Sequence, residues 1–76
     1  MTKAFVLIHC ETGREFYVYK KLQKIPEATE IWVTYGPFDL LCKLETTSEQ
    51  YLKDIVINDI RKIPHIKETE TLLVYV

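Results

Sequence analysis

Apolar runs of strand length alternate along this chain with segments of helical periodicity. The runs span residues 4–10, 30–35, 38–45 and 66–76, and their β-branched, aromatic and aliphatic side chains suit a pleated surface. The segments between them place apolar residues at helical spacing, namely Val18, Leu22 and Ile25 in the first and Leu52, Ile55, Val56, Ile60 and Ile63 in the second. The pattern predicts the order strand, helix, strand, strand, helix, strand.

Start and stop signals bound the first predicted helix. Thr12 and Glu15 have the spacing of a capping box, in which each side chain bonds a free amide of the first turn. We expect the helix to continue to about Ile25, because the residue before Pro26 is pushed out of the helical region.

The second predicted helix begins near Thr47 or Ser48, and Thr46 competes for the capping role. Pro64 ends it, and the tripeptide Lys-Ile-Pro closes both helices. Two strand–helix–strand halves joined by a hairpin predict an α+β, ferredoxin-like βαββαβ fold. Right-handed crossovers then place both helices on one face of a four-stranded antiparallel sheet. The chain, residues 1–76, is one domain.

A Gly-Pro pair separates the two central runs and predicts a hairpin with a tight turn at Gly36 and Pro37. The same corner has a glycine backbone, a fixed proline and the carboxylate of Asp39. Such a corner can admit a small ligand to the main chain while Asp39 faces its positive end. We therefore predict a binding module rather than an enzyme.

The first strand has apolar residues on both of its faces, whereas a sheet half exposed to water alternates apolar with polar. Phe5, Leu7 and His9 point away from the predicted helices, and Leu41 joins them from the third strand. Two helices cannot cover both faces of the sheet. We predict that a second copy covers the open face through an isologous homodimer contact.

Composition limits the partners and the chemistry. The net charge is −1 and no long basic run is present, which argues against a nucleic-acid surface. Cys10 and Cys42 lie inside apolar runs without metal-site spacing, so we expect buried thiols rather than a disulfide or a zinc site. No segment resembles a signal peptide or a membrane span, and the expected location is the cytoplasm.

Two stretches resemble one known family. Residues 34–45, TYGPFDLLCKLE, are similar to the Gly-x-aromatic-Asp hairpin of the C-terminal effector-binding (RAM) domain of Lrp/AsnC (feast/famine) regulators. Residues 63–74, IPHIKETETLLV, resemble the closing strand of that domain, with its alternating threonines. The resemblance implies an amino-acid effector bound between adjacent dimers, assembly up to octamers, and no cofactor. The first strand starts within three residues of Met1, so we expect a stand-alone module without a helix-turn-helix and without direct DNA binding.

The resemblance assigns roles in an amino-acid site. Asp39 would bind the ammonium, although an aspartate at a hairpin end also bonds local amides. Gly36 would expose main-chain groups, although the turn can require glycine for its backbone angle alone. Thr69 and Thr71 emerge from one strand face and would donate to the carboxylate from a neighbouring dimer. The remaining candidates for the pocket are Pro37, Phe38 and Tyr35, although core or interface packing also suits Phe38 and Tyr35.

Other functions compete with amino-acid binding. A ligand-independent module could form homo- and hetero-oligomers, including assemblies with full-length Lrp/AsnC regulators. Binding of RNA bases would use Phe5 and Tyr75 but lacks basic surroundings. An acylphosphatase-like enzyme would need an arginine in a glycine-rich loop after the first strand, and Gly13-Arg14, at a predicted helix start, matches this pattern only weakly. Neither His9 nor His65 has metal ligands at suitable spacing.

Overall fold

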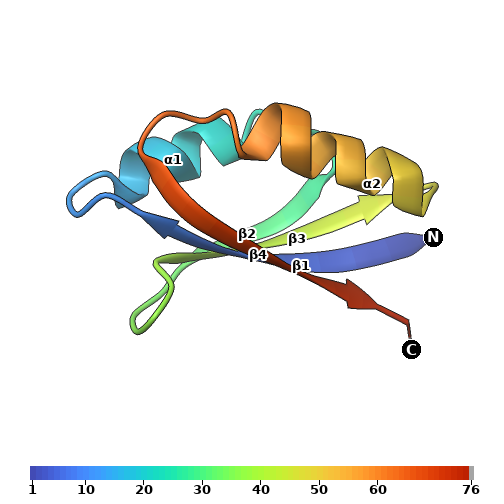
Figure 1. Cartoon of the computed structure of the whole chain (residues 1–76), viewed down its shortest axis with the longest axis horizontal. Helices are drawn as coiled ribbons and strands as arrows, with labels where there is room; N and C mark the ends of the chain where they lie inside the picture. The colour runs from blue at the N-terminus through green and yellow to red at the C-terminus, as the bar shows by residue number, and fades with distance from the viewer. Residues whose placement is uncertain (76) are drawn as a thin grey trace.

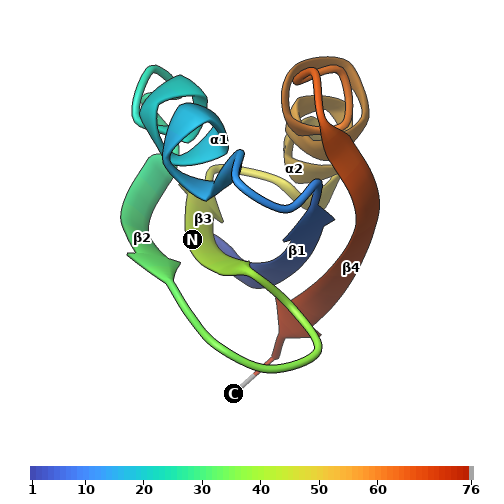
Figure 2. The ribbon, with the colours of Figure 1, turned by 90° about the vertical axis from the view of Figure 1, so that its left-hand side faces the viewer.

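The fold is a four-stranded antiparallel sheet with two helices on one face. The computed structural model describes residues 1–75. Its elements are β1 (Thr2–Cys10), α1 (Glu15–Leu22), β2 (Ala28–Val33), β3 (Leu40–Thr46), α2 (Glu49–Ile55), a π-helical turn η1 (Val56–Ile60) and β4 (Ile66–Val74). The strand order is β2-β3-β1-β4, and every neighbouring pair is antiparallel. Figures 1 and 2 show both helices above the sheet, which confirms the ferredoxin-like prediction.

The core lies between the helices and one face of the sheet. Along β1, alternate residues from Ala4 to Cys10 are buried, whereas Phe5, Leu7 and His9 between them remain partly exposed. The predicted helical stripes face this core and confirm the periodicity, because Val18, Leu22, Leu52, Ile55, Val56 and Ile60 are all buried. Cys10 and Cys42 are buried free thiols, as expected.

The predicted start and end of the first helix are wrong. The N-cap is Arg14 and no side chain caps it, whereas Glu15 reaches back to the backbone N–H of Gly13 at 3.2 Å. Gly13 has a φ of 87°, so the chain reverses there and separates Thr12 from the helix. The helix ends at Leu22, three residues before Ile25, which follows in a turn.

Ser48 caps the second helix, in agreement with one of the two expected starts. Its Oγ accepts a hydrogen bond from the backbone N–H of Tyr51 at 3.1 Å. Thr46, the competitor, instead donates to the carbonyl of Ser48 at 2.7 Å. The helix then widens into η1, where the N–H of Arg61 bonds the carbonyl of Val56 at 2.9 Å. No helix of residues 1–75 is both long and apolar enough to cross a bilayer.

The hairpin between β2 and β3 exists, but its turn is not tight. Six residues, 34–39, lie between the strands, because β2 ends at Val33 and β3 begins at Leu40. Thr34 closes this loop, since its N–H bonds the carbonyl of Asp39 at 2.8 Å and its hydroxyl bonds the carbonyl of Phe38 at 3.0 Å. Figure 1 shows the tip of the loop extending below the sheet, at the end of the sheet where α1 begins. β4 ends at Val74, and the predicted strand end at Val76 lies outside the described residues.

Candidate functional site

The candidate site lies at the end of the sheet where β1 leads into α1. β1 and β2 are both antiparallel to β3, so they run in the same direction and their last residues lie at the same end. This brings the β2–β3 loop beside the first turn of α1. A cavity of about 410 Å³ forms there, lined by Glu15, Phe16, Val33, Thr34, Tyr35, Gly36 and Asp39. We call it the corner cavity.

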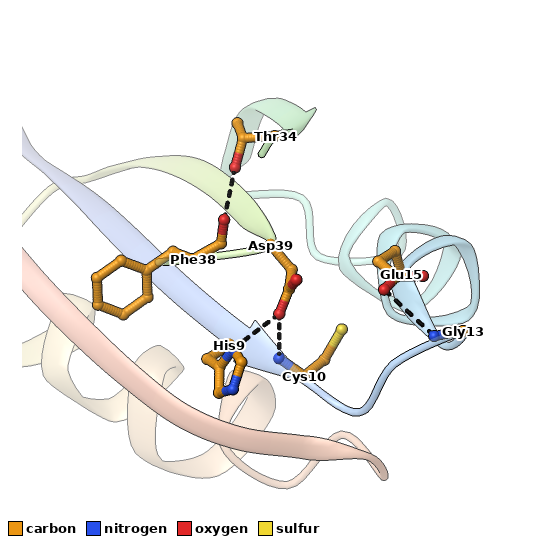
Figure 3. A network of polar contacts seen from close by, with 7 residues as sticks. All are labelled: His9, Cys10, Gly13, Glu15, Thr34, Phe38 and Asp39. Carbon is orange, nitrogen blue, oxygen red and sulfur yellow. Dashed lines mark hydrogen bonds and ion pairs between the residues drawn. The ribbon is translucent and has the colours of Figure 1, made fainter. Parts of the chain in front are cut away.

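Asp39 is fixed from two directions (Figure 3). Its Oδ2 accepts a hydrogen bond from the backbone N–H of Cys10 at 2.9 Å, and Nδ1 of His9 lies 2.9 Å from the same oxygen. No hydrogen bond among residues 1–75 uses Oδ1 of Asp39. The backbone N–H of Asp39 also bonds the carbonyl of Ile8 at 2.8 Å. One carboxylate oxygen of Asp39 therefore anchors the loop to β1, and the two nitrogen donors that hold Asp39 both use this oxygen.

The corner is electronegative. Burial raises the pKa of Cys10 to about 11, and the charges of Asp39, Glu15 and Glu11 add to the rise. The lining of the corner cavity includes two carboxylates and no lysine, arginine or histidine. Within residues 1–75, no three His, Cys, Asp or Glu side chains form a group that could hold a metal ion. The electrostatics of the corner favour a cationic group.

Two of the four predicted corner residues line the cavity, Gly36 and Asp39, whereas Pro37 and Phe38 belong to the loop but not to the lining. Gly36 has a φ of 114°, and a Cβ at this position would meet nothing within 4 Å. Its backbone angle therefore explains the glycine without a close approach by another group. Phe38 contributes its carbonyl as the acceptor for Thr34.

The two predicted threonines lie elsewhere in the chain. Thr69 and Thr71 are opposite Ile8 and Val6 across the β1–β4 pairing, so both face the helix side of β4, at the far edge of the sheet. Thr71 lines a second hollow of about 240 Å³ between α2–η1 and β4. The other residues of this edge groove are Leu52, Lys53, Val56, Ile57 and Leu73. The structure does not bring the threonines to Asp39 within one chain.

Sequence reasoning missed the wall that α1 contributes to the corner cavity. The sequence pattern indicates only a capping role for Glu15 and no role for Phe16, which is 69% exposed. Val33 and Thr34 adjoin the loop and were also missed. The element order contained a usable signal, because a βαββαβ chain places the start of its first helix beside the end of its second strand.

The open face of the sheet carries the predicted dimer residues together. Leu7 is opposite Leu41 across β1 and β3, and Leu41 is opposite Trp32 across β2. On the same face, β1 also pairs with β4, where Phe5 is opposite Leu72. Trp32 is 40% and Leu72 is 48% exposed, whereas the central residues are partly covered by their neighbours. His9 extends this face to the corner, where it meets Asp39.

Comparison with known proteins assigns the family. The family model described as the Lrp/AsnC ligand binding domain matches residues 3–75. The HTH-type transcriptional regulator FL11 of Pyrococcus horikoshii is 31% identical over 71 residues, which are 93% of this chain and 46% of the regulator. The chain thus spans about half the length of the curated relative it matches. It belongs to the Lrp/AsnC ligand binding domain family, which occurs in transcriptional regulators.

Solved structures agree with this assignment. The crystal structure of FFRP-DM1 is 37% identical, superposes with a TM-score of 0.94, and covers 99% of this chain and 100% of its own. A transcriptional regulator of Neisseria meningitidis, solved as a complex with L-Met, has a TM-score of 0.87 at 14% identity. That match covers 99% of this chain and 50% of the regulator, and it shows the shared fold alone.

Proposed function

We propose that this chain binds a free amino acid, with the ligand ammonium in the corner cavity, and acts in regulation through oligomer assembly. The observation that supports this most directly is the free Oδ1 of Asp39 in a cavity lined by carboxylates and no cation. Phe16 and Val33 offer apolar surface to the ligand side chain. The family and the L-Met complex of a protein with the same fold support the ligand class.

The ligand carboxylate needs donors that the corner cavity lacks. The edge groove offers the hydroxyl of Thr71 and the ammonium of Lys53, whose Nζ lies 3.7 Å from Glu49 and is well exposed. β2 and β4 are three inter-strand spacings apart, about 14 Å, whereas the ammonium and carboxylate of an amino acid share one carbon. We infer that the site is completed between chains, with Thr69 and Thr71 supplied by a neighbouring dimer.

The open sheet face supplies the first step of assembly in this proposal. Its central residues are Phe5, Leu7 and Leu41, with His9 at the margin, and a second copy would cover them. Dimers formed in this way then meet through corner cavities and edge grooves, whose charges are complementary, in an octamer or another closed ring. Full-length Lrp/AsnC regulators are a further expected partner because they have the same module.

Isothermal titration calorimetry of the assembled protein against the twenty common amino acids tests the proposal. At least one should bind, and its N-acetyl derivative should not, because acetylation removes the ammonium that Asp39 is proposed to hold. Absence of heat from every amino acid with a correctly assembled protein would favour the ligand-independent oligomerisation module. Equal affinity for the acetylated compound would show that Asp39 does not bind the ligand ammonium.

A further inference from the structure

The two histidines of the chain both pair with carboxylates, but only His9 contacts Asp39, the carboxylate proposed to bind the ligand ammonium. Nδ1 of His9 lies 2.9 Å from Oδ2 of Asp39, whereas Nδ1 of His65 lies 3.0 Å from Oε2 of Glu11. We propose that His9 is a positioning residue that makes amino-acid binding pH-dependent: the neutral ring orients Asp39 for the ligand, and the protonated ring opposes it. This inference rests on the proposed function.

Strand register fixes the pair. Ile8 is opposite Leu40 in the β1–β3 pairing, so the next residues along, His9 and Asp39, face each other at the strand ends. The bond from the N–H of Asp39 to the carbonyl of Ile8 continues the ladder by one residue. An ionised carboxylate only accepts, so Nδ1 carries the proton and donates it to Oδ2. Both donors to Asp39 thus hold Oδ2, and Oδ1 remains for the ligand.

Charge decides which form of His9 permits binding. Histidine is the one side chain whose unperturbed pKa places its change of charge between pH 5 and 8. A protonated His9 on Oδ2 and the ligand ammonium on Oδ1 would be two positive charges on the same carboxylate, and they repel each other. A neutral ring keeps the same hydrogen bond without this repulsion. When the ring is protonated, ligand binding should therefore release its proton.

The other charged groups around His9 come from β4 and α1. Glu68 is opposite His9 on β4, Glu70 is opposite Leu7, two residues earlier in β1, and Lys67 lies in the bulge of this strand pair. Glu15 belongs to the wall of the corner cavity. None of these groups hydrogen-bonds the ring within residues 1–75, so Asp39 is the direct partner of His9.

The test measures ligand affinity against pH in three proteins: wild type, His9→Gln and His65→Asn. His65 has a φ of 75°, which asparagine tolerates, so His65→Asn is the matched control for the loss of a histidine near the corner. The probe is L-methionine, or the amino acid that the calorimetric screen selects, because its ammonium and carboxylate keep their charges from pH 5.5 to 7.5. Because the protonated ring opposes the ligand, affinity should fall about 10-fold from pH 7.5 to 5.5.

The outcomes separate this inference from the proposed function. Wild type and His65→Asn should both show the 10-fold fall, and His9→Gln should vary by less than about 2-fold. Equal affinity at both pH values in wild type, or an unchanged fall in His9→Gln, overturns the inference and leaves the binding function standing. No binding at either pH overturns the function itself. Wild-type calorimetry in two buffers of different ionisation enthalpy should also report a released proton, whether or not His9→Gln folds.

Discussion

Asp39 has a structural task and a proposed binding task, and two substitutions separate them. In Asp39→Ala, the N–H of Cys10 loses its acceptor, and this residue is only 2% exposed. An unsatisfied buried donor costs about 1–3 kcal/mol. The ring of His9 is 40% exposed and can turn to water, so it adds little to the cost. Asp39→Asn keeps a side-chain oxygen for Cys10 and should cost less than about 1 kcal/mol.

Urea unfolding followed by far-ultraviolet circular dichroism measures this difference in free energy, and thermal unfolding followed by the same signal measures the corresponding shift in Tm. In a domain of this size each kcal/mol shifts Tm by about 4–8 °C, so Asp39→Ala should lower Tm by at least about 4 °C. An alanine variant within about 0.5 kcal/mol of wild type would refute the anchoring role, because surface substitutions stay within that range.

The binding task responds differently to the same pair. Asp39→Asn removes the charge that the ligand ammonium is proposed to meet, and a hydrogen bond to a charged group contributes about 1.5–3 kcal/mol. Amino-acid affinity should then fall about 10- to 150-fold in calorimetry. Glu15→Gln is the control, since it removes a second carboxylate of the cavity without touching Cys10. Unchanged affinity in Asp39→Asn would place the ammonium elsewhere.

Three further predictions concern assembly and stability. Leu41→Glu should raise the dimer dissociation constant more than about 100-fold in sedimentation velocity, because the two-fold contact buries the new charge twice. Tyr51→Glu, on α2 and outside both cavities, is the control, and an equal effect of the two substitutions would refute a sheet-face dimer. Burial raises the pKa of Cys10 to about 11 and of Cys42 to about 12. These thiols ionise at lower pH in the unfolded chain than in the folded one, so the free energy of unfolding should fall above about pH 9, by up to about 1.4 kcal/mol per pH unit for each thiol. Cys42→Ala should remove the contribution of one thiol to this pH dependence. An unchanged pH dependence in Cys42→Ala would contradict the raised pKa of Cys42. Ser48→Ala should lower the free energy of unfolding by about 1 kcal/mol in urea, because the cap of α2 is lost. An unchanged free energy of unfolding would show that the Ser48 side chain does not stabilise the helix.

The fold was accessible from sequence because its signals agree with one another. The alternation along β1 is confirmed, whereas α1 ends at Leu22 and η1 at Ile60, each a few residues before the proline that the sequence indicated as its stop. The helix start was missed because Gly13 adopts a positive φ, and no pattern of apolar residues reports a backbone angle. The turn length was missed because Thr34 closes a wider loop with its own hydroxyl.

The site was accessible only in part. Asp39 and Gly36 stand out because their residue types are unusual between two apolar strands. The cavity wall from α1 lies about twenty residues away along the chain, and only the folded sheet end places Phe16 beside Val33. The partnership of His9 with Asp39 likewise depends on strand register, since thirty residues separate them.

The position of Trp32 has a practical consequence. It is the single tryptophan of the chain, and it lies on the open sheet face next to Leu41, 40% exposed. Its fluorescence therefore comes from the surface that self-association would shield from water. A blue shift of emission on concentrating the protein would report dimer formation without any label, and the same signal would reveal whether an effector added at the corner alters that contact.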